Sequence, residues 1–246
     1  STFEQAASLT PGTPVDGELK PATTDLYRFE GAEGDSFFID LSNLFSGVLE
    51  DFRVIDPFGN EVERSVFTSR ITLPQTGTYT LLVEGTNFGT TPSAYTLNVQ
   101  PVADITQALT VGETTSGSIG TSAQEAIYSF TLNERSLLFL DSLTNNNDLR
   151  VTLTGPAGSE LSDFPLLYSN NRPRVVTIDA APGDYTLTVR NRLNRTGAFD
   201  FRLWNADQAS ELTLGTSTSG TTEQEDIASL YRFDAAVGDQ LMFDVQ

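Results

Sequence analysis

One stretch of sequence occurs three times in this chain, and this repetition constrains the fold more than any other feature. The copies begin at Leu9, Leu109 and Leu212, so that 100 and 103 residues separate successive starts. A period of this size corresponds to one small domain, because the repeats of solenoid proteins are only about 20 to 50 residues long. We therefore expect a series of similar domains.

Shared landmarks follow each leading leucine in the same order. A glycine-containing turn comes first and a Tyr-x-Phe pair comes next, whose two aromatic side chains should lie on one face of a strand. The glycines are Gly12 and Gly17, Gly112 and Gly117, and Gly215 and Gly220, and the aromatic pairs are Tyr27 and Phe29, Tyr128 and Phe130, and Tyr231 and Phe233. Later landmarks, Pro-x-Gly and Gly-x-Tyr-Thr-Leu, occur only in the first two copies. The predicted organisation is two complete repeats, 1–102 and 103–206, and a partial third repeat, 207–246, with N-terminal strands only.

Apolar and polar residues alternate with a period of two in many short segments separated by Gly- and Pro-containing turns. This pattern is typical of strands that have one buried face. The segments are 26–30, 37–41, 79–83, 95–99, 127–130, 149–153, 175–178 and 185–189, with two more at 227–233 and 240–245 in the third copy. No long helical pattern interrupts them. The predicted fold is all-β, with tandem antiparallel jelly-roll-like β-sandwich domains.

The composition argues against several classes of function. The chain has no Cys and no His, which removes the usual general base and the usual ligands of zinc. Acid pairs such as Glu50 and Asp51 point to opposite faces of a strand, so we expect no enzyme. The net charge of −19 opposes binding to nucleic acid. No apolar run approaches the roughly 20 residues of a transmembrane segment, so none is expected.

The landmarks resemble the bacterial pre-peptidase C-terminal (PPC) domain family. In the first repeat the matching residues are Gly17, Asp25, Tyr27, Phe29, Gly34, Pro57, Gly59, Gly77, Tyr79 and Leu81. The second repeat departs from the pattern at Ala126, in place of the acid, and at Arg135, in place of a glycine. The resemblance implies a secreted, non-catalytic sandwich, either beside an extracellular peptidase or in tandem in a surface protein. It also implies an extracellular or cell-surface location, and some members bind calcium or polymers.

Three kinds of binding site are candidates. Calcium prefers carboxylate and carbonyl oxygens, which Glu223, Glu225 and Asp226 could supply; Asn145 to Asp148 is a second such segment, and ordinary exposed turns are the alternative for both. No cofactor is required. A docking patch on the second repeat would use Arg172, Arg174, Arg190, Arg192, Arg195 and Arg202, and a solvated face with local ion pairs is the alternative. A polysaccharide partner would need exposed aromatics, for which Phe45, Phe52, Phe58, Phe67, Phe88, Phe164 and Tyr168 are candidates. The alternative is that most of the phenylalanines belong to the core.

The partial third repeat suggests self-association. Its strands would expose apolar residues and unpaired edges, and the candidate assembly residues are Ile227, Leu230, Tyr231, Phe233, Leu241, Phe243 and Val245. A neighbouring copy could complete them head to tail by strand addition, or further repeats of a longer chain could do so. We therefore expect a non-catalytic extracellular structural protein that acts as a spacer or as a fibre subunit. The alternative is a calcium- or glycan-binding accessory region of a secreted hydrolase.

Overall fold

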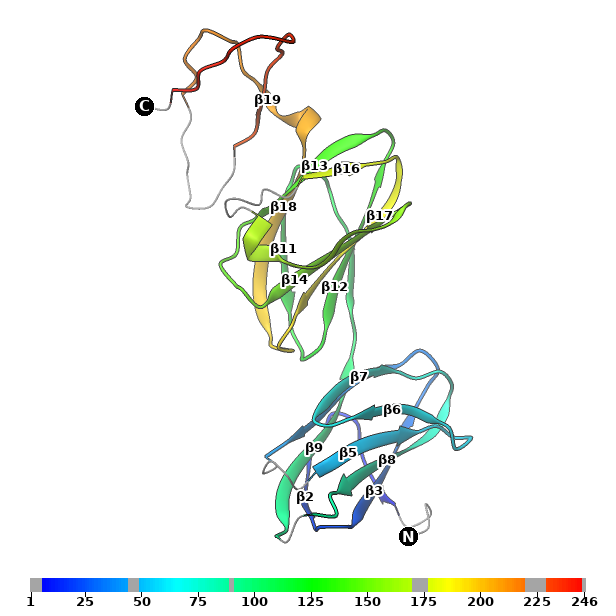
Figure 1. The fold of residues 1–246 in the computed structure, drawn as a ribbon. Coiled ribbons are helices and arrows are strands. Elements are labelled where there is room, and N and C mark those ends of the chain that lie inside the picture. Colours follow the sequence, from blue (N-terminus) through cyan, green and yellow to red (C-terminus); the bar gives the residue numbers. More distant parts are fainter. Residues whose placement is uncertain (1–5, 44–48, 89–90, 170–176, 220–228, 245–246) are drawn as a thin grey trace. The chain divides into compact units, whose positions relative to one another are not determined.

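The computed structural model describes residues 6–43, 49–88, 91–169, 177–219 and 229–244. Clustering of contacts divides the chain into two compact units, residues 1–103 with 121–123 and residues 104–120 with 124–246. We call strands β1–β9 domain 1 and strands β10–β18 domain 2 (Figure 1). Each is a sandwich of two β-sheets, which confirms the predicted all-β fold class.

Domain 1 consists of a five-stranded and a four-stranded sheet. The five-stranded sheet has the order β1 (Ala7–Ser8), β3 (Thr24–Gly31), β8 (Gly77–Gly85), β5 (Leu49–Ile55) and β6 (Glu61–Ser65). The four-stranded sheet has the order β2 (Val15–Leu19), β9 (Ser93–Val102), β4 (Ser36–Ser42) and β7 (Thr68–Thr72). Apart from the consecutive pair β5 and β6, most neighbouring strands come from distant parts of the sequence, so each sheet depends on long-range pairing.

Domain 2 repeats this topology strand for strand. Its five-stranded sheet has the order β10 (Ile105–Ala108), β12 (Glu125–Leu132), β17 (Gly183–Asn191), β14 (Leu149–Gly155) and β15 (Gly158–Pro165). Its four-stranded sheet has the order β11 (Thr114–Ile119), β18 (Gly197–Asn205), β13 (Ser136–Ser142) and β16 (Thr177–Ala180). Two short 3-10 helices, η2 (Leu166–Ser169) and η3 (Ala206–Gln208), complete the described elements of this domain.

Each domain has its own hydrophobic core between its two sheets. Alternation along the strands directs one set of side chains inward, as predicted for the Tyr-x-Phe pairs: Tyr27 and Phe29 are 7% and 2% exposed, and Tyr128 and Phe130 are 1% and 7% exposed. A sandwich of about 100 residues can bury such a core without help from a neighbour.

The first strand of each copy pairs parallel to the Tyr-x-Phe strand, which the antiparallel prediction did not include. β1 pairs with β3, β10 pairs with β12, and β19 (Ser210–Glu211) pairs with β20 (Tyr231–Arg232). The leading leucine of every copy then donates its backbone N–H to a carbonyl of that strand. The pairs are Leu9 to Arg28 at 2.8 Å, Leu109 to Ser129 at 2.8 Å and Leu212 to Arg232 at 2.7 Å.

The late landmarks of the two complete repeats meet in space. Gly77 lies against the ring of Pro57, where an added Cβ would come within 2.6 Å of Cγ, and Gly183 lies in the same way against Pro156 at 2.3 Å. Two residues beyond each glycine is a buried tyrosine. The Tyr79 hydroxyl donates to the carbonyl of Gln75 at 2.7 Å and the Tyr185 hydroxyl to that of Ala181 at 2.8 Å. The spacing of these motifs thus reflects packing at one corner of the sandwich.

The third copy keeps local turns but forms few strands. Asp239 caps its turn as Asp35 does in domain 1: its N–H donates to the carbonyl of Ala236 at 3.1 Å, and its Oδ2 accepts from the N–H of Ala236 at 2.7 Å. Only Tyr231–Arg232 of the expected strand 227–233 is strand within the described residues. The strand expected at 240–245 is wrong for residues 240–244. The equivalent β4 pairs with β7 and β9, and the described third copy has no counterpart of those strands.

Candidate functional site

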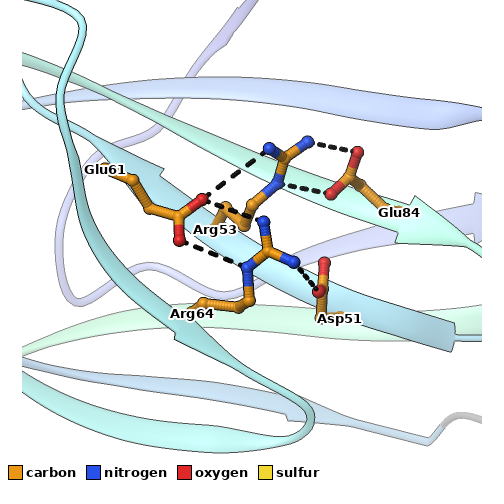
Figure 2. A network of polar contacts seen from close by, with 5 residues as sticks. All are labelled: Asp51, Arg53, Glu61, Arg64 and Glu84. Carbon is orange, nitrogen blue, oxygen red and sulfur yellow. Dashed lines mark hydrogen bonds and ion pairs between the residues drawn. The ribbon is translucent and has the colours of Figure 1, made fainter.

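A network of charged side chains covers the outer face of the five-stranded sheet of domain 1. Phe52 and Val54 of β5 point into the core, so Asp51 and Arg53 of the same strand point outward. Glu61 and Arg64 join them from β6, and Glu84 from β8 (Figure 2).

The strand register places like charges opposite each other. Arg53 pairs with Arg64 across β5 and β6, and Asp51 pairs with Glu84 across β5 and β8. Like charges in directly opposite positions destabilise a sheet. The ion pairs between strands therefore join residues that are not directly opposite each other, Arg53 with Glu84 and Arg64 with Asp51, as Figure 2 shows.

Two arginines hold the network together. Arg53 donates two hydrogen bonds to the Glu84 carboxylate, from Nε and from Nη2, both 2.5 Å long. Arg64 donates to Glu61 from Nε at 3.2 Å and from Nη2 at 3.1 Å, and its Nη1 lies 3.2 Å from Oδ2 of Asp51. Paired bonds from one guanidinium fix the position of a carboxylate as well as neutralising it.

One carboxylate oxygen of the network is left uncompensated. Asp51 is 9% exposed, and among the described residues its Oδ1 has no hydrogen-bond partner. Burial, together with the adjacent Glu84, raises the pKa of Asp51. The hydrogen bonds from Arg53 lower the pKa of Glu84. Asp51 is thus the group in this network best placed to accept another donor.

The network borders an open pocket of about 360 Å³. Its lining residues are Ala22, Thr23, Thr24, Glu50, Asp51, Arg53, Arg64, Glu84, Gly85 and Asn87. The pocket is mainly polar, with more acidic than basic side chains. Such a surface suits a cationic hydrogen-bond donor better than an apolar ligand.

The candidate arginine patch is divided into local contacts. Arg190 pairs with Asp163 at 2.7 Å, whereas Arg192 and Arg195 share Asp148 at 2.8 Å and 3.7 Å. Arg202 lies on β18, in the other sheet, with its guanidinium 4.6 Å from the ring centroid of Trp204. Arg172 and Arg174 lie outside the described residues. Each described member thus has a partner within domain 2.

The candidate calcium ligands Glu223, Glu225 and Asp226 also lie outside the described residues. Within the described ranges, no cluster of three or more acidic side chains has the arrangement of a metal site. In the second candidate segment, the Asp148 carboxylate binds Arg192, and the backbone N–H of Asp148 donates to Asn146 Oδ1 at 2.9 Å. That segment is a turn closed by its own side chains.

The assembly residues that the structure describes are largely exposed. Tyr231 is 44% exposed, Leu241 41% and Phe243 67%. The rings of Phe233 and Phe243 touch, with centroids 5.7 Å apart, and Leu230 is half-buried. Ile227 and Val245 are not among the described residues.

The exposed aromatics of domain 1 are on three different connections. Phe58, Phe67 and Phe88 are 77%, 52% and 94% exposed and follow β5, β6 and β8 respectively. Phe52 is fully buried in β5, so its assignment to a sugar-binding surface was wrong. In domain 2, Phe164 is half-buried and Tyr168 is 41% exposed, and Phe45 lies outside the described residues.

Sequence reasoning named Asp51 but missed the rest of the charged network. A sequence signal for the network existed, because Arg53, Arg64 and Glu84 occupy outward-facing positions of strands in which apolar and polar residues alternate. It could be interpreted only after the register was known, since 31 positions separate Arg53 from Glu84.

The comparisons with known proteins add the following. No protein-family model matches the chain, and no curated protein matches it. Among solved structures, the chain is similar to the pre-peptidase C-terminal domain of a Bacillus anthracis collagenase, with 18% identity, 39% of this chain and 95% of that chain covered, and a TM-score of 0.34. It is also similar to PliG of Aeromonas hydrophila, a periplasmic inhibitor of g-type lysozyme, with 14% identity, coverage of 39% and 96%, and a TM-score of 0.33.

A third similarity is to the CUB1-EGF-CUB2 domains of rat MASP-1, with 9% identity, 80% of this chain and 100% of that chain covered, and a TM-score of 0.25. At these identities and TM-scores the similarities assign neither a family nor a function. Within the described ranges, no helix has the length and apolar character needed to cross a membrane.

Proposed function

We propose that the chain is a non-catalytic extracellular structural protein, whose tandem β-sandwich repeats act as spacers or as subunits of a surface fibre. The observation that carries this proposal is the recurring start of the fold. In all three copies the leading leucine donates to the Tyr-x-Phe strand across 2.7–2.8 Å. A chain that repeats one self-contained sandwich in this way is built to extend an array.

The charged network supports a structural role over a catalytic one. Arg53 and Arg64 hold Glu84 and Glu61 in paired hydrogen bonds. These carboxylates have lowered pKa values because of those bonds. General acid–base catalysis favours groups whose pKa lies near the working pH, and Glu61 and Glu84 are moved away from it. Asp51 is the exception, because burial raises its pKa. The resemblance of the sequence motifs to PPC domains supports an extracellular location.

The third copy supplies a means of assembly. Tyr231, Leu241 and Phe243 are exposed, whereas Tyr27 and Phe37, the equivalents of the first two, are 7% and 4% exposed in domain 1. Strands added to the third copy would bury these residues and pair its backbone, which is the general mode of β-strand addition. We propose that a neighbouring copy of the chain supplies those strands.

Sedimentation of the full chain beside its Phe243→Asp variant tests this assembly. Burial of a phenylalanine contributes about 1.5–3 kcal/mol, and every 1.4 kcal/mol changes an equilibrium constant about tenfold. We expect Phe243→Asp to weaken self-association tenfold or more. Because the side chain is 67% exposed, the two sandwiches should unfold as before.

Phe88→Asp is the matched control, since Phe88 is 94% exposed in domain 1 and the charge change is the same. If Phe243→Asp associates as strongly as the control, assembly through the third copy is wrong. The same measurement with calcium chloride and with EDTA tests the candidate ligands Glu223, Glu225 and Asp226. Equal sedimentation in calcium chloride and in EDTA would show that assembly does not depend on calcium.

A further inference from the structure

The two domains carry opposite charges at equivalent places on the same sheet. In domain 1, Asp51 pairs directly with Glu84. In domain 2, the same two positions hold Arg150 and Arg190, which also pair directly. A pair of acids on one sandwich therefore corresponds to a pair of arginines on the other.

The charge at a third position, on the edge strand, is inverted as well. Arg64 of β6 and Asp163 of β15 each lie one position before the residue that pairs with Phe52 or Val151. Arg64 contacts Asp51 at 3.2 Å, and Asp163 contacts Arg190 at 2.7 Å. Across β8, β5 and β6 the outer face of domain 1 thus carries acid, acid and base, and across β17, β14 and β15 that of domain 2 carries base, base and acid.

This inversion decides which faces attract. We consider the arrangement in which equivalent positions of two such faces stack on each other, so that each position contacts its own counterpart. Two domain 1 faces would then bring acids against acids and Arg64 against Arg64. One face from each domain brings opposite charges together at all three positions. Complementary charges of this kind select partners and fix register.

Each face also keeps one charged side chain whose bonding within its own domain is incomplete. In domain 1, the Oδ1 atom of Asp51 has no hydrogen-bond partner among the described residues. In domain 2, Arg150 donates to the carbonyls of Asn147 at 2.7 Å and Leu149 at 3.1 Å, and it contacts no carboxylate in the described part of the chain. Asp51 and Arg150, the two residues concerned, occupy equivalent positions on their respective sheets.

We propose that the outer face of the five-stranded sheet of domain 1 binds the corresponding face of domain 2 in a second copy of the chain. The guanidinium of Arg150 or Arg190 then enters the 360 Å³ pocket and donates to Asp51. The contact joins different surfaces and therefore propagates head to tail. It rests on the proposed structural function, but it uses none of the residues of the third copy.

A mixing experiment with two variants tests the contact. All chains are full length and carry Phe243→Asp, which weakens any assembly through the third copy. The tail variant also carries Arg150→Glu and Arg190→Glu, and the head variant also carries Asp51→Asn and Glu84→Gln. In analytical ultracentrifugation we expect the parent chain to self-associate, and we expect each variant alone to do so at least tenfold more weakly.

Mixing the two variants leaves one intact domain 1 face and one intact domain 2 face, so we expect a 1:1 pair and no larger species. This rescue shows that both variants are folded. Arg202→Glu is the matched control, because it reverses an arginine on the other sheet of domain 2, and it should associate like the parent. Added salt should weaken every complex, since exposed charges are screened.

Three results would overturn the proposal. The first is a parent chain that sediments as one chain at every concentration. The second is a tail or head variant that associates like the parent, and the third is a mixture of the two that forms no pair. These outcomes leave the proposed function intact, because assembly through the third copy is measured separately with Phe243→Asp alone.

Discussion

A buried tyrosine shows how one residue can change its role between copies. In domain 1 the Tyr27 and Tyr95 hydroxyls share a 2.5 Å hydrogen bond, and Tyr95 donates to Oδ2 of Asp25 at 2.7 Å. Burial raises the pKa of Tyr95, which keeps its hydroxyl protonated as a donor. The chain of hydrogen bonds satisfies both hydroxyls inside the sandwich.

Domain 2 keeps the first tyrosine and loses its partners. Phe199 occupies the place of Tyr95, since each lies opposite the second glycine of its copy, and Ala126 occupies the place of Asp25. The hydroxyl of Tyr128, which is 1% exposed, has no hydrogen-bond partner in the described part of the chain. An unpaired buried hydroxyl costs about 1–3 kcal/mol.

We therefore expect the same substitution to have opposite effects in the two domains. Tyr128→Phe should leave the free energy of unfolding of domain 2 unchanged or raise it by about 1 kcal/mol, because it removes an unsatisfied group. Tyr27→Phe should lower that of domain 1 by about 1–2 kcal/mol, because it removes the buried hydrogen bond between Tyr27 and Tyr95. Urea denaturation followed by fluorescence measures both, and equal losses in the two domains would contradict this account.

The sequence predicted the burial of these tyrosines but could not predict their partners. Tyr27 and Phe29 share a face because the strand period is two, and that inference needed only neighbouring residues. The bond to Tyr95 joins positions 68 residues apart. It depends on which strands face each other across the core, and a single sequence does not encode this locally.

At the scale of elements, the corner formed by Pro57 and Gly77 closes the sandwich of domain 1. Gly77 has φ of 154°, and a Cβ there would meet Cγ of Pro57 at 2.6 Å. The proline ring is rigid and cannot move aside as a long side chain would. The glycine therefore serves both the backbone conformation and the close approach.

Gly77→Ala should destabilise domain 1 more than Gly59→Ala. Both change a glycine with positive φ, at a cost of about 1–2 kcal/mol. Gly59 has φ of 91° and open space around it, so it bears only that cost. Gly77→Ala adds the overpacking against Pro57, about 1–3 kcal/mol more. Thermal unfolding of the two variants compares them directly, and equal losses would show that the contact with Pro57 is unimportant.

Alternation predicted several strands that have one apolar face, including β3, β4, β8 and β9, but the predicted segments did not include β5, β13 or β18. It missed β6 (Glu61–Ser65) and β7 (Thr68–Thr72), whose residues are mostly polar. These strands form because their partners β5 and β4 offer backbone groups to pair with. The parallel first strand was missed for a similar reason, since β1 contains only Ala7–Ser8 and shows no pattern of its own.

At the scale of the whole molecule, the two hydrophobic cores are separate clusters of residues. We expect the domains to unfold as two units, as multidomain proteins commonly do. Leu81→Ala and Leu187→Ala remove equivalent side chains, each 0% exposed, and each should cost its own domain about 2–5 kcal/mol. Calorimetry should show one transition lowered and the other unchanged in each variant. If either substitution lowered both transitions equally, the domains would be coupled.

The repeat itself could be predicted from the sequence, because the landmarks recur in order. The opposite charges of the two domains could not, because they become visible only when the strand registers are superposed. Asp51 and Arg150 are unremarkable charged residues in a sequence with 33 acidic and 14 basic side chains. Their significance comes from occupying one position on one sheet.

The hydrogen bond from the leading leucine bears on how such a chain emerges from the ribosome. Leu9 bonds to Arg28, 19 positions further along the chain, whereas Val15 of β2 pairs with Leu97 of β9, 82 positions further along. Contacts that are close in sequence form quickly, and distant ones carry a larger loop-closure cost. We therefore expect the opening segment of each repeat to be in place while the rest is still being translated. A newly made repeat would then hold its first strand aligned until the closing strands arrive.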